Sequence, residues 1–267
     1  MTSRPPAGNN RMPTEQDKRI QAEKEWHDSE DLQRNESQLI RGVYGSNLFA
    51  EAESHFLNAL GDVQGLRILD FGCGTAHSSY QLQARQARVT GIDLSLPRII
   101  EGKGWFSRPE KQNEPSFAIA AGEYLPFDEG TFDAVCGKQI LHHVVLETAM
   151  PEIVRVLKTG GKAVFLEPLR HNPILEGYRR LTPHLRSPSE RALSMTDLAE
   201  IGAYFKTWQH QEFVLLSALP VLLETGLRRR NALQSMTDRM RKVDRFLTQK
   251  IPAIGRYYWE TVIILEK

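Results

Sequence analysis

Two acids and two glycines stand at a spacing that suits a nucleotide-like cofactor. Asp70 closes a short apolar run, and Gly72 and Gly74 follow it at once. Because glycine has no Cβ atom, bare backbone at such a turn can lie against a bulky ligand. Asp93 ends a second apolar run, 23 positions after Asp70. A carboxylate there can accept hydrogen bonds from both hydroxyls of a ribose, although it can also cap the following helix.

Histidines supply the second candidate chemistry. His142 and His143 follow the apolar run 132–137, and an unperturbed imidazole is ready to take a proton near pH 7. His171 follows a later run, and with Glu167 and Asn172 it forms an alternative catalytic or substrate-binding set. That set can equally be a proline-punctuated turn stabilised by Asn172. No converging acid or cysteine set accompanies the histidine pair in the sequence, so we expect no metal site.

Short apolar runs and helical patterns must position these residues. Strands are expected close to 67–70, 89–93, 117–120, 132–137 and 162–166. Between them we expect helices, with one beginning near His77 and another near Pro97. The first run has few polar residues, which is typical of a parallel strand covered on both faces. Open sheets of this kind bind ligands beyond the carboxyl ends of their strands.

Taken together, the motifs resemble those of class I S-adenosylmethionine-dependent methyltransferases, in the small-molecule branch of the type 11/25 kind. The signatures DxGCGTG, AExLPF and LKxGG are matched over residues 64–169 by Asp70–Thr75, Gly122–Phe127 and Leu157–Gly161. The resemblance implies a Rossmann-like α/β fold: a seven-stranded, mostly parallel sheet with helices on both faces and an added helical cap. A dinucleotide dehydrogenase is disfavoured, because His77 stands at the third glycine position of G-x-G-x-x-G.

The resemblance also implies S-adenosylmethionine as cofactor, with Asp70 near its methionyl amine. Ala121 stands where the family usually has an acid for the adenine, so the adenine would rely on the backbone of the next two residues. Related enzymes often use a Leu-His-His segment to line the cofactor or cap a helix, and that reading stays open beside a catalytic one. The expected cofactor-binding residues are Asp70, Gly72, Cys73, Gly74, Asp93, Leu94, Gly122, Glu123 and Gln139, and the candidate bases are His143, His171 and His142.

The chain divides into five expected segments. They are a disordered tail (1–16), an N-terminal helical lid (17–63), the cofactor-binding core (64–169), a helical cap with one late strand (170–256) and a final antiparallel strand (257–267).

Two parts of the expected lid have candidate roles. A helix near Trp26 and His27 can cover the cofactor, or Trp26 can simply dock that helix on the core. Tyr44 stands in a break between helices, where it can reach the substrate or pack against other residues.

The segment 228–250 is basic, with eight Lys and Arg residues against two acids. Met236, Met240, Val243 and Leu247 recur at helical spacing, which suits a solvated helix packed on the core. With the apolar run before it, residues 215–250 can instead cap a hydrophobic pocket or rest on an anionic membrane. A phosphate-binding patch for RNA is a further alternative.

Composition narrows the function. A formal charge of +1 over 267 residues gives no overall electrostatic case for nucleic acid or membrane. Two cysteines make no disulfide framework, and the N-terminus has no apolar signal core, so we expect a cytoplasmic protein. The expected activity is methyl transfer to the oxygen, nitrogen or carbon of a small, hydrophobic acceptor. An RNA or protein methyltransferase and a cofactor-binding regulator without turnover are the alternatives.

Overall fold

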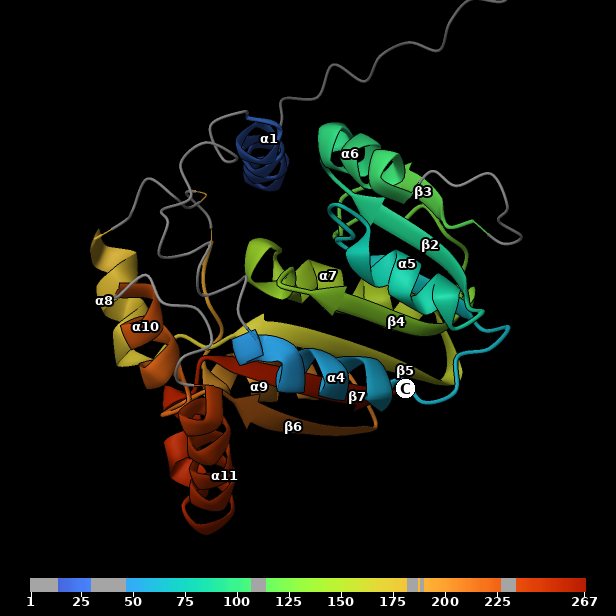
Figure 1. Ribbon diagram of the computed structural model, residues 1–267. Helices are drawn as coiled ribbons and strands as arrows, with labels where there is room; N and C mark the ends of the chain where they lie inside the picture. The colour runs from blue at the N-terminus through green and yellow to red at the C-terminus, as the bar shows by residue number, and fades with distance from the viewer. Residues whose placement is uncertain (1–13, 30–46, 107–113, 182–186, 188–189, 227–233) are drawn as a thin grey trace, which may run out of the picture.

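A seven-stranded sheet forms the centre of the computed structural model, which describes residues 14–29, 47–106, 114–181, 187, 190–226 and 234–267 (Figure 1). The strand order is β3-β2-β1-β4-β5-β7-β6. Strands β3, β2, β1, β4 and β5 pair in parallel, whereas β7 lies antiparallel between β5 and β6. The strands are β1 (Arg67–Phe71), β2 (Arg88–Asp93), β3 (Ser116–Ile119), β4 (Phe132–Lys138), β5 (Leu157–Pro168), β6 (Thr207–Phe213) and β7 (Glu260–Glu266).

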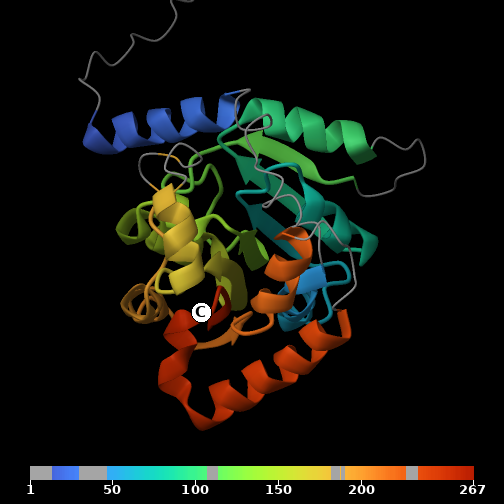
Figure 2. The same cartoon turned by 60° about the vertical axis from the view of Figure 1, so that its left-hand side comes forward.

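Helices cover both faces of the sheet, which confirms the expected fold class. Side chains of α4 and α5 pack on one face, and side chains of α7 and α9 pack on the other. Helices α1 and α6 lie near the β2 and β3 edge, while α8, α10 and α11 gather beyond the other end (Figures 1 and 2). The helices are α1 (Glu15–Asp28), α4 (Ala50–Ala59), α5 (His77–Ala84), α6 (Leu96–Phe106), α7 (Leu146–Val156), α8 (Pro173–Leu181), α9 (Met195–Gly202), α10 (Ala218–Gly226) and α11 (Gln234–Lys250).

The two-sided core explains the apolar strands. In β1, Ile68 joins the cluster under α4 while its neighbour Leu69 joins the cluster under α7, and both side chains are fully buried. A parallel strand that is covered on both faces has no solvent side, so its apolar residues run consecutively rather than alternate. The predicted assignment of 67–70 as a buried parallel strand is therefore confirmed, with one residue added at its end.

The strand order creates a crevice where the chain reverses direction across the sheet. From β1 the chain continues to β2 and β3 on one side, whereas β4 and β5 lie on the other. The loops that leave the carboxyl ends of β1 and β4 therefore diverge, and open α/β sheets bind ligands at this point. Gly72 and Gly74 lie on the loop after β1, and His142 and His143 lie on the loop after β4.

The structure differs from three of the expected segment assignments. Helix α4 does not belong to a lid, because its Phe56 and Leu57 are buried in the core with β5 residues Val164 and Leu166. Helix α9 is likewise a core helix, through the buried Leu198 and Ile201, rather than part of a cap. The final strand begins at Glu260 and not at residue 257, because residues 252–257 form a 3₁₀ helix.

The N-terminal end of the lid also differs slightly from expectation. Thr14 caps α1, and its hydroxyl accepts a hydrogen bond from the Asp17 backbone N–H while the Asp17 carboxylate accepts from the Thr14 N–H. This capping box starts the helix at Glu15, inside the segment expected to be a disordered tail. The remainder of that tail, residues 1–13, and the expected Tyr44 contact lie outside the described residues.

Helix α11 buries the predicted apolar stripe only in part, since Met240 and Leu247 are half-buried. Met236 and Val243 are 42% and 37% exposed, although the sequence pattern places them against the core. The buried side of α11 carries Thr237 and Asp244 instead. The Asp244 carboxylate accepts hydrogen bonds from the backbone N–H groups of residues 215–217 ahead of α10, and these bonds fix how the helix is turned. Within the described residues, no helix is long and apolar enough to span a membrane.

Candidate cofactor and acceptor site

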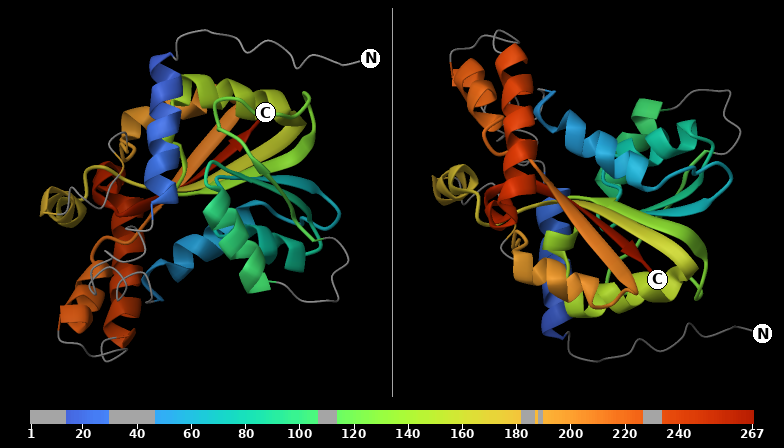
Figure 3. Two further views of the ribbon diagram at one scale, coloured as in Figure 1. Left: turned by 90° about the horizontal axis from the view of Figure 1, so that it is seen from above. Right: turned by 90° about the horizontal axis from the view of Figure 1, so that it is seen from below.

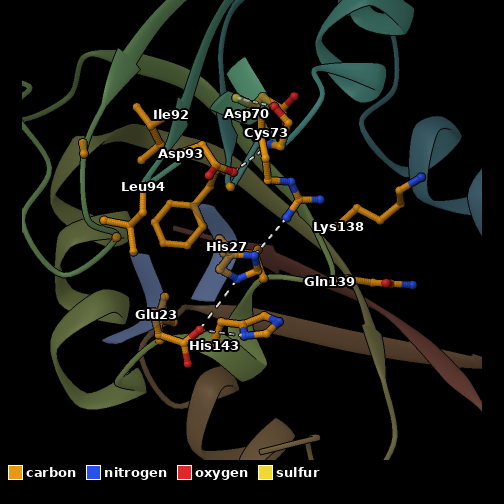
Figure 4. A pocket seen from close by; sticks show the side chains of 18 of the residues that line it. Glu23, His27, Asp70, Cys73, Ile92, Asp93, Leu94, Lys138, Gln139 and His143 are labelled. Atoms are coloured by element: carbon orange, nitrogen blue, oxygen red, sulfur yellow. Dashed lines mark hydrogen bonds and ion pairs between the residues drawn. The ribbon is translucent and has the colours of Figure 1, made fainter. Parts of the chain in front are cut away.

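A cavity of about 320 Å³ lies at the diverging loops. Its walls come from the loops after β1, β2, β3 and β4 and from one side of α1. Figure 4 shows Asp70, Cys73 and Asp93 on one side of His27, and Glu23 and His143 on the other. All of the expected cofactor-binding residues line this cavity: Asp70, Gly72, Cys73, Gly74, Asp93, Leu94, Gly122, Glu123 and Gln139.

The glycine loop, residues 72–75, presents main chain to the cavity. Gly72 and Gly74 have φ values of +72° and +49°, in the left-handed region that favours glycine. A Cβ atom on Gly72 would lie 2.4 Å from Cγ1 of Ile140, so the space beside it is also closed to any side chain. Helix α5 begins at His77, and its first N–H groups lie at the end of the same loop. A bulky ligand can therefore lie directly against this backbone.

Asp93 ties the loop to the end of β2. Its Oδ2 atom accepts a hydrogen bond from the Gly74 N–H at 2.7 Å, and its Oδ1 atom accepts from the Ser95 N–H at 2.9 Å. The turn-capping role that was the alternative for Asp93 is thus present. Because a carboxylate has about four lone-pair positions, the residue still has acceptor capacity toward the cavity that it lines.

Asp70 lies fully buried beneath the loop. Its Oδ2 atom accepts a hydrogen bond from the Ser79 hydroxyl at 2.5 Å. Burial raises the pKa of Asp70 to about 6, although the Ser79 hydrogen bond and Lys138 oppose that shift. Above that pH a buried negative charge faces the cavity, which suits a cationic amine. Burial likewise raises the pKa of the Cys73 thiol, so this thiol lines the cavity without nucleophilic character.

The side chain of Glu123 contacts other residues of the protein. Its carboxylate accepts from the Val145 N–H at 3.0 Å and lies 3.6 Å from the Arg19 guanidinium. Only its backbone and that of Gly122 are left for the cofactor, as the sequence suggests for the adenine. Gln139 also directs its side chain away from His27 (Figure 4) and donates to Glu260 Oε1 at 3.2 Å.

The histidine pair divides into two different environments. His142 Nδ1 lies 2.7 Å from Oε2 of Glu167, a completely buried carboxylate. Oε1 of Glu167 accepts from the backbone N–H groups of Ile140 and Leu141, both at 2.8 Å, which fixes the carboxylate and leaves it no donor. Nδ1 of His142 therefore carries the proton, and its Nε2 atom is an acceptor. This tautomer is the one a general base needs.

His143 turns toward α1 instead. Its Nδ1 atom lies 3.3 Å from Oε2 of Glu23, and its backbone carbonyl accepts a hydrogen bond from Arg19. His27, one turn after Glu23 on α1, contacts Arg98 of α6 at 3.1 Å. Helix α1 therefore lies along the cavity and contacts both the loop after β4 and α6. Figure 3 shows this helix from above.

The structure does not bring all of the predicted site residues into the cavity. His171 is exposed and does not line the cavity, and Asn172 is buried with its side chain donating to the Tyr257 carbonyl and capping α8. The turn-stabilising interpretation of Asn172 is the one that the structure shows.

Of the two lid candidates, His27 lines the cavity and Trp26 does not. The residues that sequence reasoning did not place here are Arg19, Glu23 and Arg98. The i, i+4 spacing of Glu23 and His27 was the available signal.

The residues present fit S-adenosylmethionine. The glycine loop offers a main-chain cradle, Asp70 offers a carboxylate beneath it, and Asp93 stands at the end of β2 for the ribose. Residues 69–165 match the family model described as "Methyltransferase domain". Residues 69–165 therefore match a methyltransferase domain, and the strand order is that of the class I S-adenosylmethionine-dependent methyltransferases that the sequence motifs resemble.

Curated relatives support the same class over part of their length. The chain is 29% identical over 159 residues to the O-methyltransferase cnsE of Penicillium expansum, covering 53% of this chain and 58% of that protein. It is 36% identical over 114 residues to a demethylmenaquinone methyltransferase of Beutenbergia cavernae, covering 42% of this chain and 44% of that protein. The chain thus spans about half the length of these relatives.

Solved structures share the fold across most of the chain. A geranyl diphosphate methyltransferase bound to geranyl diphosphate and sinefungin superposes with a TM-score of 0.58 at 17% identity, covering 81% of this chain and 77% of that one. Phosphoethanolamine N-methyltransferase 2 of Haemonchus contortus, solved with S-adenosylmethionine, gives a TM-score of 0.61 at 16% identity, covering 86% and 57%.

Proposed function

We propose that this chain transfers a methyl group from S-adenosylmethionine to a hydroxyl group of a small, largely apolar acceptor. The observation that carries the proposal is His142, which lines the same cavity as the glycine loop and is held from behind by the buried Glu167. Ile20, Ile140 and Val144 add apolar surface on that side of the cavity. The curated relatives named as O-methyltransferases and demethylmenaquinone methyltransferases support a small-molecule acceptor.

The chemistry requires alignment and one proton transfer. When bound, S-adenosylmethionine supplies an electrophilic methyl group on a sulfonium. His142 Nε2 would take the proton of the acceptor hydroxyl as its oxygen receives the methyl group. The cofactor would supply that group from its sulfonium, keep the bonding electron pair on sulfur and leave as S-adenosylhomocysteine. Glu167 holds the His142 ring by its Nδ1–H and stabilises the imidazolium. Helix α1 excludes water from the open side of the cavity.

A transfer assay tests the proposal. The full chain is incubated with S-adenosylmethionine and a panel of phenols and reduced naphthoquinones, with product identified by mass spectrometry. We expect a methyl ether with at least one acceptor class. Cofactor binding without transfer to any acceptor would contradict the proposal and favour the regulator without turnover. Transfer to nitrogen or carbon acceptors alone would show that His142 does not act as the base for a hydroxyl acceptor.

The surface of α11 favours a lipid contact as a second property, which we also propose. Phe246 is 57% exposed and extends the exposed stripe of Met236 and Val243. Arg239, Lys242 and Lys250 are exposed along the same side of the helix. A helix that exposes apolar and basic side chains on the same side suits an anionic membrane surface, where the basic groups attract headgroups and the apolar side chains insert.

Vesicle sedimentation tests this contact. Binding to vesicles of phosphatidylcholine with phosphatidylglycerol should exceed binding to phosphatidylcholine alone and weaken with salt. The Phe246→Ser variant should bind several-fold less, while Ile100→Ser, which changes an equally exposed side chain on α6, should bind as the wild type does. Equal binding by the two variants contradicts the proposal, and salt-sensitive binding to RNA without vesicle binding would transfer this surface to the RNA alternative.

A further inference from the structure

Three side chains of metal-ligand type converge between α1 and the loop after β4. Glu23 and His27 are one turn apart on α1, and His143 approaches them from a segment more than a hundred residues later. One ligand atom from each lies within 4.8 Å of the others. Figure 4 shows the three side chains pointing toward one another inside the cavity.

The spacing of these atoms suits an ion better than hydrogen bonds. Oε2 of Glu23 lies 3.3 Å from His143 Nδ1 and 3.6 Å from His27 Nε2. Nitrogen and oxygen ligands about 2.0–2.1 Å from one ion, at angles of about 90° to 110°, lie roughly 3.0–3.4 Å apart. His143 Nδ1 is buried and has no hydrogen-bond partner among the described residues. The distances from Glu23 to the two histidines are thus close to the spacing of ligands around one ion, while Nδ1 of His143 lacks a hydrogen bond.

The carboxylate is held in a suitable orientation. Glu23 is 2% exposed, and its Oε1 atom accepts a hydrogen bond from the Ser187 hydroxyl at 2.6 Å. Oxygen atoms of ligating carboxylates are commonly fixed in this way by a neighbouring donor, which aims the second oxygen at the ion.

We propose that Glu23, His27 and His143 form a binding site for a first-row divalent cation such as Zn²⁺. Two imidazoles and one carboxylate make a ligand set that leaves at least one coordination position open. That position faces the cavity and can take an oxygen atom of the acceptor. The use of the ion for the acceptor rests on the proposed function, whereas cation binding itself does not. The sequence predicts no metal site because the acid comes from α1, far from the histidine pair in the chain.

Arg98 disfavours cation binding by His27, and this provides a test of the site. Its guanidinium can only donate, so His27 Nδ1 accepts at 3.1 Å and the ring proton stands on Nε2. A cation on Nε2 requires the proton to move to Nδ1, and Arg98 must then release the ring. Glutamine at position 98 can accept from Nδ1–H through its amide oxygen. Arg98→Gln should therefore tighten cation binding rather than weaken it.

The experiment uses the full chain without a histidine tag, cofactor or acceptor, so that its failure leaves the test of methyl transfer untouched. Zn²⁺ affinity is measured by competition with a chromogenic chelator, and Co²⁺ is added separately to record its visible ligand-field spectrum. We expect one ion per chain, a loss of about 10- to 100-fold or more in His143→Ala and His27→Ala, and no change in the exposed control His171→Ala.

The outcomes separate clearly. The Co²⁺ spectrum of the wild type reports nitrogen and oxygen ligation without depending on any variant, and circular dichroism identifies a variant that fails to fold. Binding of one ion that is weakened at His27 and His143 and tightened in Arg98→Gln supports the site. Zn²⁺ affinity that is equal in wild type, His143→Ala and His171→Ala overturns it, and so does a wild type that binds no ion.

Discussion

The glycine-loop side of the cavity is made of main chain, whereas its histidine side is made of side chains. Gly72, Gly74 and Asp93 belong to two neighbouring strand ends, and a hydrogen bond from the Gly74 N–H to Asp93 closes the cradle. On the opposite side, Glu23 comes from α1 and His142 and His143 come from the loop after β4, while Glu167 holds His142 from behind. A cofactor shared by many enzymes can be bound by backbone geometry, but an individual acceptor needs individual side chains. We therefore propose that the first side sets the class of reaction and that the second selects the acceptor.

The largest effect is expected on the histidine side. His142→Ala removes the proposed base, and general-base catalysis is worth about 10²- to 10⁴-fold in rate. Turnover should fall by that factor while the dissociation constant of S-adenosylmethionine stays within about twofold. The measurement is kcat on the best acceptor together with calorimetric cofactor binding.

His171→Ala is the matched control for that prediction. It removes an exposed imidazole outside the cavity, so it should retain wild-type kcat. Glu167→Gln tests positioning: it should lower kcat and leave cofactor affinity unchanged. Full turnover in His142→Ala would show that alignment alone is sufficient on this side.

A smaller effect is expected from backbone strain on the glycine-loop side. Gly72→Ala and Gly130→Ala both place a Cβ atom at positive φ, which costs about 1–2 kcal/mol of stability each. Only at Gly72 would the Cβ also meet Ile140, whereas nothing lies within 4 Å of the position at Gly130. Gly72→Ala should therefore lose about tenfold or more in cofactor affinity, and Gly130→Ala should lose stability alone. Equal cofactor affinities in the two variants would contradict a main-chain cradle.

The smallest effect concerns a buried acid behind Gln139. Burial raises the pKa of Glu260 to about 8 from 4.5, against the attraction of Lys138. Because the folded state holds the proton more tightly, this group's stabilising contribution is fully present below about pH 4.5 and is lost as pH rises through 8. Glu260→Gln keeps an acceptor for Gln139 and should raise stability by about 1–3 kcal/mol at pH 9, with no gain near pH 4.5.

Thermal or urea unfolding of wild type and Glu260→Gln across this pH range checks the sign. A gain that is the same at pH 4.5 and pH 9 would show that packing, not ionisation, distinguishes the two proteins. Cofactor affinity should not change, since the Gln139 side chain is directed away from the glycine loop.

The same contrast explains what the sequence could predict. The glycine loop and Asp93 are local features, since each is a strand end followed by a turn, and the sequence alone places them correctly. The base required more: His142 is visible as a residue type, but its partner Glu167 becomes adjacent only because β4 and β5 pair in parallel. His171 also ends a strand region, yet Pro173 begins α8 beside it and the side chain stays exposed.

Helices gave the least reliable predictions because their rotation depends on tertiary contacts. The stripe of α11 has the right period, but the Asp244 carboxylate binds three backbone N–H groups and turns that polar side inward. In α1, Glu23 is one of many charged residues in a helix with almost no apolar face. The i, i+4 spacing to His27 is its one local signal, and its contacts with His143 and Ser187 come from residues far away in the chain.

Calorimetric titration of the full chain with S-adenosylmethionine and S-adenosylhomocysteine, beside Asp93→Ala, tests the central claim most directly. The variant removes the carboxylate that holds Gly74 and faces the ribose position. We predict micromolar binding to the wild type and a loss of about 10- to 100-fold in the variant, the size expected for charge-assisted hydrogen bonds. A folded wild type that binds neither compound, or a variant that binds both as well as the wild type does, would contradict the assignment of this cavity.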